Sequence, residues 1–144
     1  MNVDAMLCDA ATVREGLLNV LGAGITRVWR DNFPAPMGTQ LALLLHASAE
    51  EMGKQHKLTI TMNDSSKTKI AEVALDFSVS PNANNRPGEM VTVPLVASFQ
   101  QQPLPKQDAY TIDLNIDGKV VKTLNFFAGS APKVPTVPTG SAKG

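Results

Sequence analysis

The sequence predicts an all-β protein: a single immunoglobulin-like or C2-like antiparallel β-sandwich with an extended Pro-rich C-terminal tail. Short runs in which apolar and polar residues alternate recur along the chain, separated by turn residues, as is typical of sandwiches and barrels. No long segment shows the 3.6-residue period of an amphipathic helix. Asp117-Gly118 joins two alternating runs and favours a hairpin, because both residues of a type I′ turn need positive φ.

In the first part of the chain, strands are predicted over residues 3–8, 17–21 and 25–29. Gly22-Ala23-Gly24 has the form of the start of a dinucleotide-binding motif, but Arg27 occupies its third glycine position. No helix follows that could hold a pyrophosphate, so the glycines are interpreted as a bend between strands.

The middle of the chain alternates more regularly and predicts strands over residues 41–47, 58–62, 73–79 and 90–99. Residues 49–53 are expected to form one helical turn, and residues 82–88 an exposed loop rich in Asn, Pro and Gly. Pro94 cannot donate a backbone hydrogen bond, so its strand is placed at a sheet edge or a bulge.

The closing hairpin can be predicted in more detail. Strict pairing would place Leu124 and Phe126 on the outer face, so a one-residue bulge is expected near Lys122-Thr123 to return them to the core. Tyr110 follows Pro103-Leu104-Pro105 at the start of its strand. It is either the tyrosine corner of an immunoglobulin-like sandwich or an ordinary half-buried tyrosine.

Composition excludes several classes of function. The 144 residues include 13 Lys and Arg and 13 Asp and Glu, and the basic residues are scattered, so neither nucleic acid nor an anionic membrane surface is expected as a partner. No apolar run is long enough to span a bilayer. With no signal peptide in view and a lone cysteine, Cys8, cytoplasmic localisation is the default expectation.

No catalytic, cofactor-binding or metal-binding residue is predicted. Asp113, Asn115 and Asp117 match the start of a calcium loop, but Leu124 stands where the bidentate carboxylate is needed. His46 is expected to face solvent or a partner, and His56 to be structural. Cys8 is expected to pack as a small hydrophobic residue, and Asp9 to cap a turn or line a site. Trp29 is expected in the core, with an interaction surface as the alternative.

Three segments carry a resemblance: Ala5-Met6-Leu7-Cys8-Asp9-Ala10, Gly16 to Gly24, and Tyr110-x-Ile112 with Ile116-Asp117-Gly118. On these the chain resembles an uncharacterised family of small bacterial and phage proteins, over residues 3 to about 127. The resemblance implies a single β-sandwich but no activity, so it assigns no functional residue. The segment 82–88 departs from the pattern of that family.

Residues 1–128 are predicted to form the sandwich and residues 129–144 a tail that cannot build a core. The expected function is that of a non-enzymatic structural or accessory interaction module, in a phage particle or another large assembly, so localisation would be the virion if the protein is phage-encoded. The expected partner is a protein or a second copy in a homo-oligomer; binding of a small ligand or carbohydrate is the alternative. The predicted interaction residues are Asn82, Asn84, Asn85, Arg86, Pro94, Pro132, Pro135 and Pro138.

Overall fold

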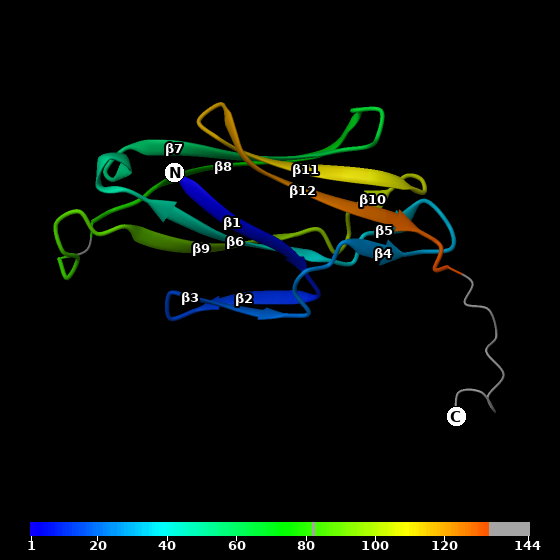
Figure 1. Cartoon of the computed structure of the whole chain (residues 1–144), viewed down its shortest axis with the longest axis horizontal. Helices are drawn as coiled ribbons and strands as arrows, with labels where there is room; N and C mark the ends of the chain where they lie inside the picture. The colour runs from blue at the N-terminus through cyan, green and yellow to red at the C-terminus, as the bar shows by residue number, and fades with distance from the viewer. Residues whose placement is uncertain (82, 133–144) are drawn as a thin grey trace, which may run out of the picture.

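The computed structural model describes residues 1–81 and 83–132 and shows two larger β-sheets packed face to face (Figure 1). Two small sheets accompany them: a two-stranded hairpin that forms a third layer, and a pair of two-residue strands. The all-β prediction is confirmed. The strands are β1 (Asn2–Cys8), β2 (Ala10–Arg14), β3 (Leu17–Leu21), β4 (Arg27–Trp29), β5 (Ala35–Pro36), β6 (Gln40–Ala47), β7 (Gln55–Asn63), β8 (Lys69–Ser78), β9 (Val91–Ser98), β10 (Pro103–Leu104), β11 (Asp108–Ile116) and β12 (Lys119–Gly129). The predicted helical turn is the 3₁₀ segment η1 (Ala49–Glu51).

The larger sheet has five strands in the order β4-β12-β11-β7-β8. Neighbouring strands of this sheet pair antiparallel, with the exception that β4 runs parallel to β12. The fold therefore departs from the purely antiparallel sandwich that was predicted. Alternate residues of the central strands point inward, so Leu58, Ile60, Ile112 and Leu114 are buried in the core. The outward residues between them are mostly Thr, Asn and Asp.

The smaller sheet has three strands in the order β1-β6-β9 and supplies the other half of the core, including Leu7, Leu41, Leu43 and Leu45. The hairpin β2–β3 lies against its outer face (Figure 1), where Ala11 packs with Cys8 and Ala42. The sequence did not predict β2. The two ends of β2 differ in burial. Its first two residues lie on the sheet beneath, whereas Thr12 to Arg14 are exposed.

The predicted final hairpin is confirmed, and so is its bulge. Asp117 and Gly118 have φ of 53° and 87°, the positive values that a type I′ turn requires. The register shifts so that Leu114 pairs with Lys122 and Asn115 with Val120, which leaves Val121 as the extra residue. The bulge is thus closer to the turn than expected, and it has the expected consequence that Phe126 is buried.

Tyr110 forms a tyrosine corner. Its side chain is 1% exposed, its ring stacks on Phe126 with 5.3 Å between centroids, and its hydroxyl donates a hydrogen bond to the carbonyl of Lys106. The same hydroxyl accepts a bond from the backbone N–H of Lys106 at 3.3 Å. The side chain therefore fixes the chain reversal that leads into β11.

Candidate interaction surface

The predicted interaction residues fall in three places. Pro94 lies on β9, while Asn84, Asn85 and Arg86 belong to the loop between β8 and β9; Pro132 follows β12. The loop and the chain beyond β12 lie at opposite ends of the sandwich (Figure 1). The loop and the Pro94 strand thus share one region of the surface, and Pro132 does not. Asn82, Pro135, Pro138 and the tail from residue 133 lie outside the described residues.

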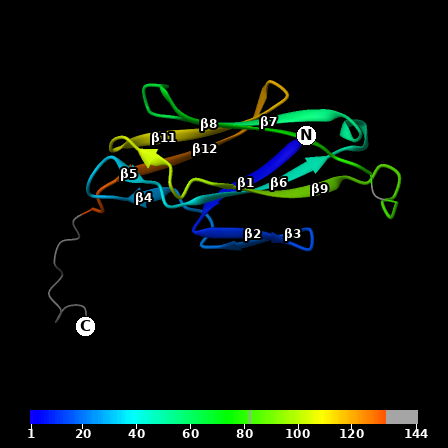
Figure 2. The same cartoon turned by 180° about the vertical axis from the view of Figure 1, so that it is seen from behind.

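The two long sides of the sandwich differ. On one side β1 lies beside β12, so the two sheets meet. On the other side, the last strand of the larger sheet is β8 and the last strand of the smaller sheet is β9, and each pairs with a neighbour on one edge only. Both views of the fold show these two strands in different layers (Figure 2). We call the region between β8 and β9 the open side.

The inward face of β8 is incompletely covered. Val73 and Leu75 pair with Ile60 and Leu58, which are buried, so all four side chains point toward the core side of the sheet. Yet Val73 is 45% exposed and Leu75 is 44% exposed. Five strands face three, so β8 has no strand opposite it that would cover these side chains.

A groove of about 230 Å³ occupies this position. Its floor is the core, through Leu43, Leu58 and Ile60. Its two walls are formed by β8 and β9, and the lining is almost entirely aliphatic. The wall residues are Val73, Ala74 and Leu75 on β8 and Leu95, Val96, Ala97 and Ser98 on β9. We call this feature the β8–β9 groove.

The free edge of β9 is interrupted by Pro94, as the sequence predicted for an edge strand. The N–H of Phe99 bonds to the carbonyl of Thr39, so odd-numbered residues of β9 direct their backbone groups toward β6. Thr92, Val96 and Ser98 direct theirs to the free edge, and Pro94 has no N–H to offer there. Pro94 therefore costs no ladder bond with β6 and weakens the outer edge as a template for pairing.

The free edge of β8 has no such interruption. The carbonyl of Lys57 bonds to the N–H of Asp117, on the β11 side of β7, so Leu58 and Ile60 direct their backbone groups toward β8. Their partners Leu75 and Val73 are thereby satisfied. Glu72, Ala74 and Asp76, which alternate with them, point their N–H and C=O groups away from the sheet.

The loop predicted over residues 82–88 lies between β8 and β9, and its described residues are exposed except for Asn85, which is half-buried. Two hydrogen bonds within the loop join Arg86 to Glu89. Glu89 Oε2 accepts a bond of 2.7 Å from the N–H of Arg86, and the N–H of Glu89 donates to the carbonyl of Arg86. This loop lies at one end of the open side and joins its two walls.

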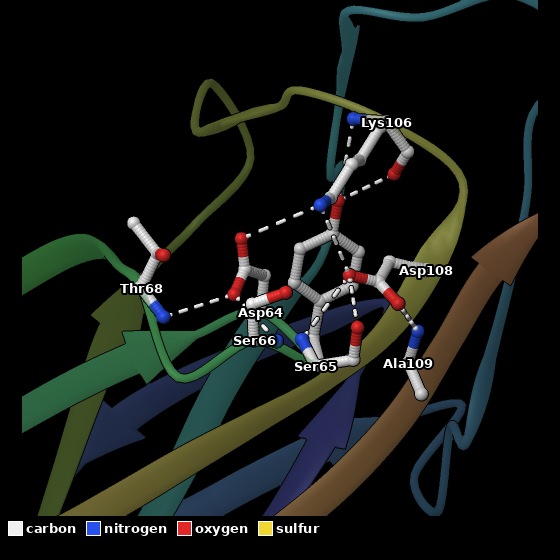
Figure 3. Close-up of polar contacts among 8 residues, drawn as sticks. Asp64, Ser65, Ser66, Thr68, Lys106, Asp108 and Ala109 are labelled. Carbon is white, nitrogen blue, oxygen red and sulfur yellow. Dashed lines mark hydrogen bonds and ion pairs between the residues drawn. The ribbon is translucent and has the colours of Figure 1, made fainter.

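At the other end of the larger sheet, a polar cluster joins the β7–β8 turn to the start of β11 (Figure 3). Asp64 Oδ1 accepts bonds of 2.9 Å from the N–H groups of Ser66 and Thr68, and Asp108 Oδ2 accepts one of 2.8 Å from the Ser65 hydroxyl. The Lys106 ammonium lies 3.6 Å from Asp64 and 3.7 Å from Asp108.

Every carboxylate in this cluster is engaged with the protein. The bonds from Ser65, helped by the N–H of Ala109 and the charge of Lys106, hold the pKa of Asp108 below its usual value in spite of some burial. Because the ligand capacity of Asp64 and Asp108 is used to close the turn and secure the corner beside Tyr110, we interpret the cluster as structural.

The two histidines lie in different parts of the structure. His46 lies on the outer face of the smaller sheet, with Nε2 2.8 Å from Asp4 Oδ2 and Nδ1 3.0 Å from Thr92 Oγ1. His56 is buried and bonds instead to Asp117 and to the carbonyl of Glu51. Both histidines thus have local structural partners, and they belong to different sheets.

For Asp9 and Trp29 the structure contradicts the first of two expectations, the turn cap and the core position. Asp9 does not cap a turn: its carboxylate lies against Gly22 and makes no hydrogen bond within the described part of the chain. Trp29 is 42% exposed on the edge strand β4, because Val28 faces the core and its two neighbours face outward; the Arg27 guanidinium lies 5.8 Å from the Trp29 ring centroid. Cys8, in contrast, packs with Ala11 and Ala42 as expected, and burial raises the pKa of its thiol.

Within residues 1–81 and 83–132, no group of His, Cys, Asp and Glu side chains is arranged to hold a metal ion. The described chain also has no helix long and apolar enough to cross a membrane. The candidate calcium residues are dispersed: Asp113 and Asn115 lie on the outer face of β11, and Asp117 binds His56.

Sequence comparison identifies the family. The chain belongs to a family of unknown function, DUF6941, whose model matches residues 3–128. That range contains all the strands except the first residue of β1, Asn2, and the last residue of β12, Gly129, so the whole sandwich is the family domain. No curated protein matches the chain.

Proposed function

We propose that this member of the DUF6941 family is a non-enzymatic interaction module, a structural or accessory component of a larger protein assembly such as a phage particle. The observation that carries the proposal is the open side, where Val73 and Leu75 point toward the core layer and are still 45% and 44% exposed. Aliphatic side chains that point toward a core are normally covered by other side chains. An uncovered aliphatic groove beside an unpaired strand therefore has the character of a binding surface for another chain.

The electrostatic and chemical character of the surface favours protein as the partner. The groove wall is aliphatic, and the nearest unsatisfied groups are the backbone donors and acceptors of two strand edges. Nucleic acid would require a basic surface, and the chain has no net charge. A second polypeptide supplies both requirements, backbone hydrogen bonds and aliphatic side chains.

The carbohydrate alternative has one supporting observation, the exposed ring of Trp29 near the hydroxyl-rich and amide-rich outer face of the larger sheet. The guanidinium of Arg27 lies against that ring and also 5.9 Å from Phe127. A sugar would have to displace a cation–π contact to stack there, so this function ranks second.

The double substitution Val73→Lys/Leu75→Lys tests the proposal by affinity capture from the source lysate. We expect the wild-type chain to retain a partner and the variant to lose it by at least about tenfold, because two aliphatic side chains worth roughly 1.5–3 kcal/mol each on full burial are replaced by charges. Both positions are exposed in the free protein, so the variant is expected to fold. Mass spectrometry of the retained proteins and circular dichroism of the variant check both points.

Thr123→Lys/Asn125→Lys is the matched control, since these exposed residues lie on β12, away from β8, and face the other side of the same sheet. It should retain the partner as the wild type does. Equal retention by the groove variant contradicts the proposal, and so does a wild-type chain that retains nothing and is monomeric by light scattering. The same light-scattering measurement on a chain truncated after Gly129 tests whether the predicted tail acts as an assembly arm.

A further inference from the structure

We infer that the β8–β9 groove binds an extended strand of a different protein, one that alternates aliphatic residues with Lys or Arg and pairs with the free edge of β8. This inference rests on the proposed function and specifies the partner. It follows from the shape of the groove, from the backbone groups left free at its rim and from the charges beside them.

The groove favours an extended strand as its ligand, because its walls are two strand edges and its lining is aliphatic. A strand that pairs with β8 sends every second side chain toward the core side, where Val73, Leu75 and Leu95 would cover it. A helix would leave the N–H and C=O groups of Glu72, Ala74 and Asp76 without partners, whereas an added strand satisfies them.

β8 is the better of the two edges for pairing. It is ten residues long and contains no proline, and its one register irregularity lies at Met62/Asn63, at the far end from Asp76. On β9, Pro94 removes a donor from the middle of the free edge. The ligand strand is therefore expected to hydrogen-bond to β8 and to contact β9 through side chains.

The charges at the rim specify the other face of the ligand. Glu72 and Asp76 lie on the outer face of β8, four residues apart, and flank the position of Ala74. Asp76 makes no hydrogen bond or ion pair with the described residues, and Glu72 is exposed and contacts Lys69 at 3.3 Å. A ligand strand with Lys or Arg opposite these carboxylates gains favourable cross-strand pairs.

The same charges argue against a second copy of this chain. An antiparallel β8–β8 pair centred on Ala74 would place Glu72 of each copy directly opposite Asp76 of the other. Like charges directly opposite each other across two strands are destabilising. Natural edge strands use such charges to prevent self-pairing, so a heterologous basic strand is the occupant that the pattern favours.

The test uses synthetic peptides of about ten residues, the length of β8, labelled for fluorescence anisotropy. The probe alternates Val and Lys; the comparison peptides alternate Val and Glu, carry the same Val and Lys residues in two blocks, or carry N-methyl groups on alternate residues. We expect the Val/Lys peptide to bind at least about tenfold more tightly than each of the others, because only it offers pairing, burial and opposite charge together.

Glu72→Lys/Asp76→Lys supplies the decisive variant, since both side chains are exposed and outside the core. It should reverse the preference, so that the Val/Glu peptide binds more tightly than Val/Lys. Equal binding of the alternating and block peptides, an unchanged preference in this variant, or no binding by any peptide overturns the inference. Dimers of the free chain that Val73→Lys/Leu75→Lys abolishes would overturn it in favour of a second copy.

The two experiments distinguish failure of the proposed function from failure of this inference. If the lysate partner depends on Val73 and Leu75 but the peptides do not discriminate, the open side is a protein-binding surface for something other than a basic strand. If the capture experiment fails, the proposed function fails with it.

Discussion

Replacing His56 with Gln is expected to lower the free energy of unfolding by about 2 kcal/mol at pH 6 and by clearly less at pH 8. Both ring nitrogens face oxygen atoms: Nδ1 lies 2.6 Å from Asp117 Oδ2, and Nε2 lies 2.6 Å from the carbonyl oxygen of Glu51. Only the imidazolium form can donate both bonds, and bonds to charged groups are worth roughly 1.5–3 kcal/mol.

The pH dependence follows from the direction of the two pKa shifts. The bond to Asp117, followed by the bond to Glu51, raises the pKa of His56 above its usual value and outweighs burial, which lowers it. Its contribution is therefore complete below the unfolded value of about 6.5 and is lost as the pH rises through the raised folded value. The pKa of Asp117 is lowered, first by His56, so its contribution is lost only in acid.

Urea unfolding at several pH values between 6 and 8 measures this effect. The range stops at 8 because the pKa of the buried Cys8 thiol is raised, so ionisation of the unfolded thiol also destabilises the fold at higher pH. His46→Gln is the matched control: His46 also has two partners but lies on the sheet surface, and the expected loss is below about 1 kcal/mol. A wild-type pH slope that persists in His56→Gln would contradict the account.

Tyr110→Phe is expected to cost about 1–3 kcal/mol of stability. The ring would still stack on Phe126, but the N–H and C=O groups of Lys106, which face the buried Tyr110 side chain, would lose the hydroxyl that serves both. The Lys106 ammonium also lies beside Asp64 of the β7–β8 turn and Asp108 of β11, so loss of the hydroxyl should loosen the polar cluster of Figure 3. Chemical denaturation measures the loss.

Thr59→Val removes a hydroxyl from the outer face of the same sheet and controls for the general effect of such a deletion. It is expected to change stability by no more than about 0.5 kcal/mol, because Thr59 is partly exposed and strands accept Val readily. If Tyr110→Phe is equally mild, the tyrosine corner contributes little to the fold.

The sandwich was predictable because its strands carry a period of two and its last turn carries Asp-Gly. The sequence also predicted the bulge, since Leu124 and Phe126 could reach the core only if one residue were added. The parallel pairing of β4 with β12 was not predictable, because it joins segments 100 residues apart and β4 has only three residues. The prediction that Trp29 lies in the core was wrong for the same reason, because Trp29 belongs to β4.

The candidate surface was predictable only in part. Pro94 marked an edge strand, because a proline in a ladder has few other places to lie. Val73 and Leu75 gave no signal, since their alternation with Glu72 and Asp76 is that of any half-buried strand. Their exposure follows from the unequal numbers of strands in the two sheets, and that inequality depends on how the strands associate across the whole chain.

Hydrogen exchange of the domain, free and bound to the partner that the wild-type chain captures, is the most direct test of the proposed role of the open side. The account predicts that binding slows exchange at the amides of Glu72, Ala74 and Asp76, which point away from the sheet in the free protein. Protection confined to other surfaces, such as Trp29 on β4 or the β2–β3 hairpin, with these three amides unchanged, would contradict it.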